Sequence, residues 1–180
     1  MKRMNIRTII VSLLILGGAG GAQATEVAAG RDLGIGVALG GPTSIVGKYY
    51  LDPDSALDFG VAFGPRWGYR GYSCRDRFDP RCDPYGYRRL GLNADYLWQN
   101  TLARSSVQLD WHIGGGARVW FWDDYYGDDL ALAARMPLGL DLMFARPNFL
   151  EVFLELAPAF YVVPGMALDI EGFVGVRLYF

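Results

Sequence analysis

The stretch LDIEGFVGVRLYF, residues 168–180, decides the fold. Alternate residues in it are apolar or glycine, and the positions between them carry Asp169, Glu171 and Arg177. A period of two is that of a β-strand, in which successive side chains point to opposite faces. The stretch therefore predicts a strand with one apolar face and one face that carries charges.

The same alternation recurs along most of the chain. In residues 149–161, for example, the apolar residues at alternate positions oppose Glu151 and Glu155. A helical period would scatter these charges around an axis, so the pattern favours strands. The predicted strands cover residues 33–39, 44–51, 56–63, 89–98, 107–121, 130–144, 149–161 and 168–180.

The composition agrees with an all-β protein. The chain has 180 residues, of which 52% are hydrophobic, 14% are aromatic and 24 are glycine, and its formal net charge is −2. This length fits one domain, and this composition fits a β-rich protein better than a helical or disordered one. Eight predicted strands, an even number, fit a closed antiparallel up-and-down barrel.

The aromatic residues help to decide which face of the barrel points inward. A soluble barrel buries its apolar face, whereas a transmembrane barrel turns that face to lipid and its polar face to the lumen. Aromatic residues on the apolar face fall at both ends of the predicted strands, as in the two girdles of a membrane barrel. They are Phe63, Phe121 and Phe160 at one end, and Trp98, Phe144 and Phe180 at the other. We therefore predict an eight-stranded transmembrane β-barrel.

The connections differ in length at the two ends of this barrel. Residues 52–55 and 146–148 form tight turns, which we assign to the periplasmic side. The longest connection, residues 65–88, then lies on the outer side, as expected for outer-membrane barrels. Pro137 and Pro158 lie within predicted strands, where each removes a backbone donor, so we expect a bulge at both.

The N-terminal residues 1–24 have the features of a secretory signal peptide. A basic segment precedes the apolar residues 9–16, and Ala22-Gln23-Ala24 supplies a small-x-small cleavage pattern. We expect cleavage before Thr25, which leaves residues 25–180 as the exported barrel. A retained anchor helix is the alternative.

The outer loops are the predicted places for contact with other molecules. Loop 65–88 holds Cys74 and Cys82, which we expect to form one disulfide after export to an oxidising compartment. Its arginines and aromatic residues would suit lipopolysaccharide phosphates, another surface ligand or a neighbouring loop, while export argues against nucleic acid. Residues 122–129, WDDYYGDD, are predicted to form an acidic loop without the spacing of an EF-hand.

The polar face of the strands supplies the candidate lumen residues. An eight-stranded barrel is just wide enough for side chains to fill, and charges in its interior must pair. We therefore predict a charged network that plugs the lumen, with a narrow cation-preferring pore as the alternative, because acids outnumber bases. The predicted lumen residues are Lys48, Asp58, Asn93, Asp95, Asp110, His112, Arg118, Arg135, Asp141, Glu151, Glu155, Asp169, Glu171 and Arg177.

Nothing in the sequence supplies a catalytic constellation. Lipid-A deacylases pair a histidine with a serine two residues away, but His112 is followed at that spacing by Gly114. Ser106 lies too far from His112 along an extended strand, and a nucleophile needs a base within reach. We predict no catalytic residue, no metal site and no cofactor. A lipid-modifying enzyme and a periplasmic lipocalin-like binder remain as alternatives.

Several motifs resemble those of a family of small eight-stranded outer-membrane barrels described from spirochaetes. The resemblance covers about residues 33–180, apart from the cysteine-bearing loop, and implies the outer membrane of a Gram-negative (diderm) bacterium. It implies little about activity. The motifs are Gly41-Pro42-Thr43, Gly47-Lys48-Tyr49-Tyr50, Ala56-Leu57-Asp58, Ala94-Asp95-Tyr96-Leu97-Trp98, Gly114-x-Gly116-x-Arg118, Arg135-x-Pro137-x-Gly139 and Glu151-Val152-Phe153-Leu154-Glu155-Leu156-Ala157-Pro158.

The last strand also resembles the outer-membrane assembly signal, which ends in an aromatic residue preceded by apolar residues at alternate positions. Val174, Val176, Leu178 and Phe180 match it, and the match implies recognition by the barrel-assembly machinery. The alternative is a chance terminal strand of a periplasmic protein. The sequence thus predicts a small outer-membrane barrel with a structural or surface-interaction role, in contact with membrane lipid and lipopolysaccharide.

Overall fold

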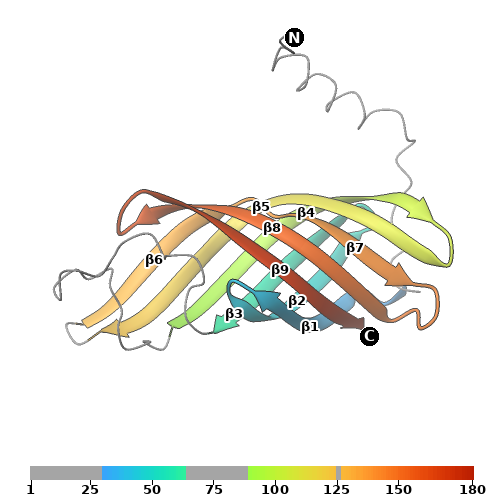
Figure 1. Cartoon of the computed structure of the whole chain (residues 1–180), viewed down its shortest axis with the longest axis horizontal. Helices are drawn as coiled ribbons and strands as arrows, with labels where there is room; N and C mark the ends of the chain where they lie inside the picture. The colour runs from blue at the N-terminus through green and yellow to red at the C-terminus, as the bar shows by residue number, and fades with distance from the viewer. Residues whose placement is uncertain (1–29, 64–88, 125–126) are drawn as a thin grey trace, which may run out of the picture.

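The computed structural model describes residues 30–63, 89–124 and 127–180 and consists almost entirely of β-strands (Figure 1). The predicted signal peptide, the predicted disulfide and loop 65–88 lie outside the described residues. The strands are β1 (Leu33–Gly40), β2 (Thr43–Asp52), β3 (Ser55–Phe63), β4 (Arg89–Arg104), β5 (Val107–Asp124), β6 (Gly127–Arg135), β7 (Leu138–Phe144), β8 (Leu150–Val163) and β9 (Ala167–Tyr179).

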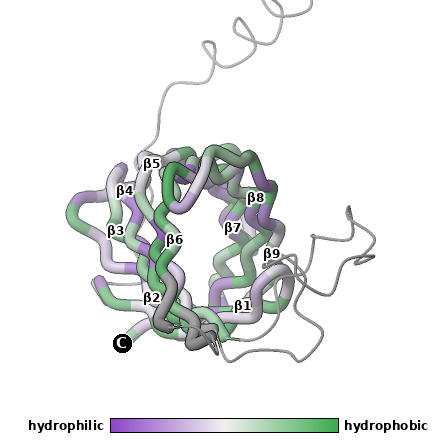
Figure 2. Tube along the Cα trace, turned by 90° about the vertical axis from the view of Figure 1, so that its left-hand side faces the viewer, coloured by the Kyte–Doolittle hydropathy of each residue, from purple (hydrophilic) through white to green (hydrophobic). Residues whose placement is uncertain are grey.

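The strands form a closed antiparallel ring, which Figure 2 shows end-on. Apart from β6 and β7, each strand pairs with the next along the chain, and β9 pairs with β1 to close the wall. β6 and β7 both pair with β5 on one side and β8 on the other, so together they occupy one position in the ring. The eight-stranded up-and-down barrel predicted from the sequence is therefore confirmed.

The two ends of the barrel differ in their connections. The tight turns from β2 to β3, β4 to β5 and β7 to β8 lie at the end that carries the C-terminus, which we call the turn end (Figure 1). At the opposite end, which we call the loop end, β1, β3, β5 and β8 finish and β2, β4, β6 and β9 begin. In the part of the chain that the structure describes, no helix is long and apolar enough to cross a membrane.

The prediction of one strand over residues 130–144 was wrong in one detail, because Met136 and Pro137 separate β6 from β7. The expected bulges at Pro137 and Pro158 are also absent. The pairing register continues unchanged across the break, both against β5 and against β8. The register shifts of this barrel lie elsewhere, at Tyr50/Asp52, Thr101/Ala103 and Leu132/Ala133.

Local hydrogen bonding explains why the prolines need no extra residue. The carbonyl of Pro137 accepts a hydrogen bond from the backbone N–H of Gly114 at 2.8 Å, and the carbonyl of Pro158 accepts one from Met136 at 2.9 Å. Each proline lacks one donor but still contributes its acceptor. The wall therefore tolerates both prolines with a short interruption in place of a bulge.

Two strand ends also extend beyond their predicted bounds. β4 continues to Arg104, six residues past the predicted end, and pairs with β5 down to Gln108. The predicted acidic loop 122–129 is mostly strand, because the ladder between β5 and β6 continues to the pair of Asp124 and Gly127. Backbone pairing in a long hairpin outweighs the loop-like composition of this segment.

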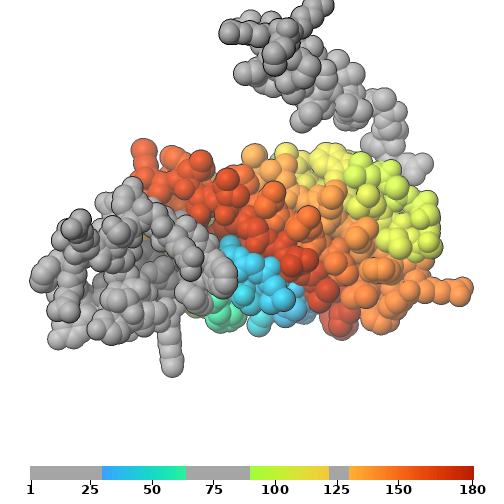
Figure 3. Space-filling view, viewed as in Figure 1, coloured from blue at the N-terminus to red at the C-terminus, as the bar shows by residue number. Residues whose placement is uncertain are grey.

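The outer surface of the barrel wall is apolar along its middle. Figure 3 shows the side chains of β8, β9 and the first strands forming a continuous surface on one side. On β9 the outward residues Val174 and Val176 are 52% and 40% exposed, whereas Arg177 on the inward face is 1% exposed. Among the described side chains, the charged ones that reach the surface lie at the ends of strands or beyond them.

The inward residues form three layers along the barrel. Two apolar layers close the ends, one at the turn end and one at the loop end, and a third apolar cluster lies between them among the charges. The turn-end layer comprises Tyr50, Ala56, Leu97, Met143 and Tyr179. The middle cluster comprises Ala38, Val46, Phe153, Ala157 and Phe173. The loop-end layer comprises Ala62, Trp120, Ala131, Ala133, Ala159 and Tyr161.

Candidate functional site

The candidate site is the set of polar side chains that alternate inward from almost every strand. All the predicted lumen residues except Asp169 are buried inside the barrel. Asp169 lies near the start of β9 at the loop end, where its carboxylate is half-buried and accepts a hydrogen bond from the backbone N–H of Ile170 at 3.0 Å. The buried set is Lys48, Asp58, Asn93, Asp95, Asp110, His112, Arg118, Arg135, Asp141, Glu151, Glu155, Glu171 and Arg177.

Arg177 on β9 is the centre of the turn-end half of this network. Its guanidinium lies 2.5 Å from Asp58 on β3 and 2.5 Å from Glu151 on β8. The same guanidinium lies over the ring of Phe153, with 3.8 Å between Cζ and the ring centroid, which is a cation–π contact. The hydroxyl of Tyr179 donates to Glu151 at 2.6 Å. Arg177 thus ties the last strand to both neighbouring and distant parts of the wall.

Lys48 and His112 share the carboxylate of Asp141 from opposite sides of the barrel. The Lys48 Nζ lies 2.8 Å from Asp141 and 3.8 Å from Glu151. The His112 Nδ1 lies 2.8 Å from Asp141, and its Nε2 lies 3.4 Å from Glu155. Because His112 contacts only carboxylates in this set, its surroundings favour an imidazolium that bridges the two acids.

Arg135 and Arg118 form the loop-end half of the network. Arg135 pairs with Asp95, with Glu155 at 2.9 Å and with Glu171 at 3.5 Å. Arg118 also pairs with Glu171. Since Glu155 contacts both His112 and Arg135, it joins the two halves into one continuous chain of charges.

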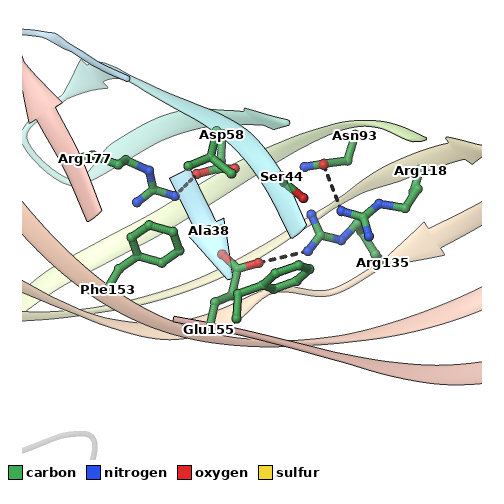
Figure 4. A pocket seen from close by; sticks show the side chains of 11 residues that line it. Ala38, Ser44, Asp58, Asn93, Arg118, Arg135, Phe153, Glu155 and Arg177 are labelled. Atoms are coloured by element: carbon green, nitrogen blue, oxygen red, sulfur yellow. Dashed lines mark hydrogen bonds and ion pairs between the residues drawn. The ribbon is translucent and has the colours of Figure 1, made fainter. Parts of the chain in front are cut away.

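Asn93 and a small cavity lie beside these pairs, as Figure 4 shows. The Asn93 amide accepts a hydrogen bond from Arg118 at 2.9 Å and donates one to Asp95 at 2.9 Å. The cavity has a volume of about 10 Å³, about the space that one water molecule needs. Ser44, Asp58 and Arg177 are among its lining residues. This cavity among the ion pairs therefore has room for about one water molecule.

Asp110 differs from the other buried carboxylates. It is 1% exposed and accepts hydrogen bonds from the Gln108 amide at 2.9 and 3.1 Å. Among the described residues it forms no ion pair with lysine, arginine or histidine within 4.0 Å, unlike the other six buried carboxylates. The network thus leaves one acid without a basic partner.

The aromatic side chains of the interior were not predicted from the sequence. Phe153 and Phe173 lie beneath the arginines, and Trp120 donates from Nε1 to the Tyr161 hydroxyl at 3.1 Å. Gly91 makes room for Trp120, because a Cβ at Gly91 would lie 2.8 Å from that indole ring. The alternation of inward and outward positions could have identified these residues, because each lies on the inward face of a strand that also carries charged residues.

Among the described residues, the contacts of the buried polar side chains are those of an ion-pair and hydrogen-bond network. The side-chain contacts of His112 given above are carboxylates, not a serine or cysteine. Across residues 30–63, 89–124 and 127–180, no three histidine, cysteine, aspartate or glutamate side chains are arranged to hold a metal ion. The geometry instead supports ion pairing that holds the wall together.

Comparison with known proteins gives structural likenesses only. No protein-family model matches the chain, and no curated protein matches it. Among solved structures, the chain is similar to Neisserial surface protein A, with 10% identity and a TM-score of 0.49 over 82% of this chain and 93% of that chain. It is also similar to Ail, the attachment invasion locus protein of Yersinia pestis, with 11% identity and a TM-score of 0.37 over 82% of this chain and 96% of that chain. The fold assignment rests on the strand pairing described above.

Proposed function

We propose that the chain is a small outer-membrane β-barrel of a diderm bacterium, with a sealed interior and a structural or surface-interaction role. One observation carries the proposal: the closed wall is apolar on its outside and charged on its inside. On β8, the outward Leu154 and Leu156 are each 55% exposed, while the inward Glu151 and Glu155 are buried. Such a wall is stable where lipid, not water, covers its outer face.

The exposed aromatic residues support this orientation. Phe63, Phe121 and Phe160 are exposed at the loop end, and Trp98 and Phe180 are exposed at the turn end. Aromatic rings prefer the two interfaces of a membrane. With short turns toward the periplasm, the loop end would face the cell exterior, so lipid and lipopolysaccharide would surround the wall.

The filled interior supports a structural role in preference to transport. The two end layers and the ion-pair network lie inside the barrel, and a cavity of about 10 Å³ among the ion pairs has room for about one water molecule. Any contact with other molecules at the cell surface would then come from the outer connections. The arginines and aromatic residues of loop 65–88 suit an anionic surface ligand.

A narrow cation-preferring pore is the second candidate, because carboxylates outnumber bases in the buried set. It would require the end layers to open. Conductance of the purified protein in a planar bilayer separates the two candidates, since a sealed barrel gives no current steps.

The membrane assignment is tested by fractionation and by gel mobility. The protein should be recovered with outer membranes, and unheated samples should migrate differently from boiled samples, because a folded barrel resists detergent until heated. Truncation of Phe180 should reduce the amount that reaches the outer membrane, if the assembly machinery reads Val174, Val176, Leu178 and Phe180. Recovery of soluble protein from the periplasm would contradict the proposal.

A further inference from the structure

We propose that the start of β9 binds an extended segment of another protein, in which apolar and basic residues alternate, along its side that faces away from β8. We call this side of residues 167–171 the β9 edge. The inference deepens the proposed surface-interaction role and rests on the loop end facing the cell exterior. β9 pairs with β8 from Ala167 onward, but its pairing with β1 starts only at Phe173. Figure 1 shows β9 projecting past the hairpin of β1 and β2.

The backbone groups of the β9 edge point to the side on which β1 has ended. The Gly172 carbonyl accepts a hydrogen bond from the Gly41 N–H at 3.1 Å, so the backbone of Gly172 faces the β1 side. Backbone groups of successive residues in a strand point to opposite sides, and those of every second residue point to the same side. The backbone groups of Leu168 and Ile170 therefore also face the β1 side. Among the described strands, none pairs with residues 167–171 there.

The side chain of Asp169 takes the place of a neighbouring strand. Its carboxylate accepts the hydrogen bond of the Ile170 N–H at 3.0 Å, where a paired strand would offer a carbonyl oxygen. An added strand would replace this contact and would also pair with the backbone of Leu168. Unpaired groups at a sheet edge are a template for another strand, and strand addition is a recurring mode of peptide recognition. The backbone of the β9 edge thus suits an extended segment.

The side chains of the β9 edge define which segment fits. The outward Leu168 and Ile170 are 71% and 65% exposed, so they offer an apolar surface. Asp169 and Glu171 alternate with them on the other face, and residues 167–171 contain no lysine or arginine. Opposite charges on directly paired residues stabilise two strands. The fitting segment therefore carries basic residues opposite the carboxylates and apolar residues between them.

A second copy of this chain fits the β9 edge less well. Antiparallel pairing of two such edges, centred on Asp169 or on Ile170, would place the Asp169 carboxylate of one copy opposite Asp169 or Glu171 of the other. Like charges directly opposite each other destabilise a pair of strands. The acids of the edge therefore favour a basic partner over self-association.

The test uses the full-length barrel, purified in detergent, and three fluorescent peptides. The first peptide alternates valine and lysine, and the second groups the same residues into two blocks. The third is the first peptide with N-methyl groups on its valine amides, which would face the β9 edge. Fluorescence anisotropy measures binding. We expect saturable binding of the alternating peptide at one per barrel, and binding of the other two weaker by about tenfold or more.

Two substitutions on β9 locate the binding. Leu168→Pro removes a backbone donor that does not pair with β8, and proline is tolerated at a sheet edge. It should weaken binding of the alternating peptide by about tenfold and leave the heat-modifiable band unchanged. Asp169→Lys reverses the charge of the edge and should also weaken binding, so it serves if Leu168→Pro does not fold. Asp32→Lys, at the turn end, is the matched control and should bind as the unmodified barrel does.

Four outcomes would overturn the proposal. They are absence of binding, equal binding of the alternating and N-methylated peptides, unchanged binding in both β9 variants, and binding that appears only after residues 65–88 are replaced by a short linker. The last outcome would show that the chain's own loop occupies the β9 edge. Recovery of soluble protein from the periplasm would overturn the outer-membrane assignment instead, and the peptide measurements on the purified barrel do not depend on it.

Discussion

Replacement of Arg177 by methionine should destabilise the barrel strongly. The substitution keeps much of the side-chain volume but removes the charge that lies 2.5 Å from both Asp58 and Glu151. It also removes the cation over the Phe153 ring. Both carboxylates stay buried, and removing one partner of a buried pair costs about 3–5 kcal/mol. We therefore expect Arg177→Met to lower the free energy of unfolding by about 3–5 kcal/mol.

Urea unfolding in lipid vesicles, followed by tryptophan fluorescence, measures this loss. Arg104→Met is the matched control, because Arg104 is an exposed arginine at a turn, where ion pairs contribute about 0–1 kcal/mol. The triple variant Asp58→Asn, Glu151→Gln, Arg177→Met should regain most of the loss, because it removes the orphaned charges as well. A loss for Arg177→Met as small as that of the control, or a triple variant as unstable as the single one, would refute the reasoning.

Two further pairs of substitutions test the wall itself. A Cβ at Gly36 would lie 1.8 Å from the Val176 carbonyl oxygen, across the pairing of β1 and β9. Gly36→Ala should therefore reduce the amount of folded, heat-modifiable protein on gels. Gly115→Ala is the control and should leave that amount unchanged, because a Cβ at Gly115 meets nothing within 4 Å. Leu156→Lys places a charge in the middle of β8 and should lower the free energy of unfolding in vesicles by about 2–4 kcal/mol. Leu102→Lys, near the turn end, should lower it by only about 0–1 kcal/mol. Equal losses within either pair would contradict the closed wall or the lipid-facing surface.

The sequence predicted well which side chains point into the barrel, because successive side chains of a strand point to opposite faces. Once Glu151 and Glu155 are placed on the inward face, every second residue of that strand is also assigned to the inward face. The same rule fails at strand ends. Asp169 shares the alternate positions of the inward residues Glu171 and Arg177, but it lies near the mouth of the barrel, where its side chain is half-buried.

Strand bounds were harder to predict where the apolar alternation stops. β4 continues from Trp98 to Arg104 through polar residues, because pairing with β5 holds the backbone there without an apolar face. The break at Met136 and Pro137 likewise depends on hydrogen bonds to neighbouring strands. These features arise from the partner strand and not from the segment's own sequence.

The partners within the charged network could not be predicted. Arg177 pairs with Asp58, 119 residues away, because the stagger of the barrel brings β9 and β3 to the same level. Stagger is a property of the closed ring, and no single strand encodes it. For the same reason, the isolation of Asp110 among the buried acids emerged only from the structure.

The sealed interior is the central claim, and conductance in planar lipid bilayers tests it most directly. The purified barrel should insert and give no current steps above those of a protein-free bilayer. This expectation rests on the ion pairs and apolar layers inside the barrel, among which a cavity of only about 10 Å³ is found. Steps that persist in the purified protein, with an ion selectivity that reverses when Glu151→Lys and Glu155→Lys are combined, would contradict the account.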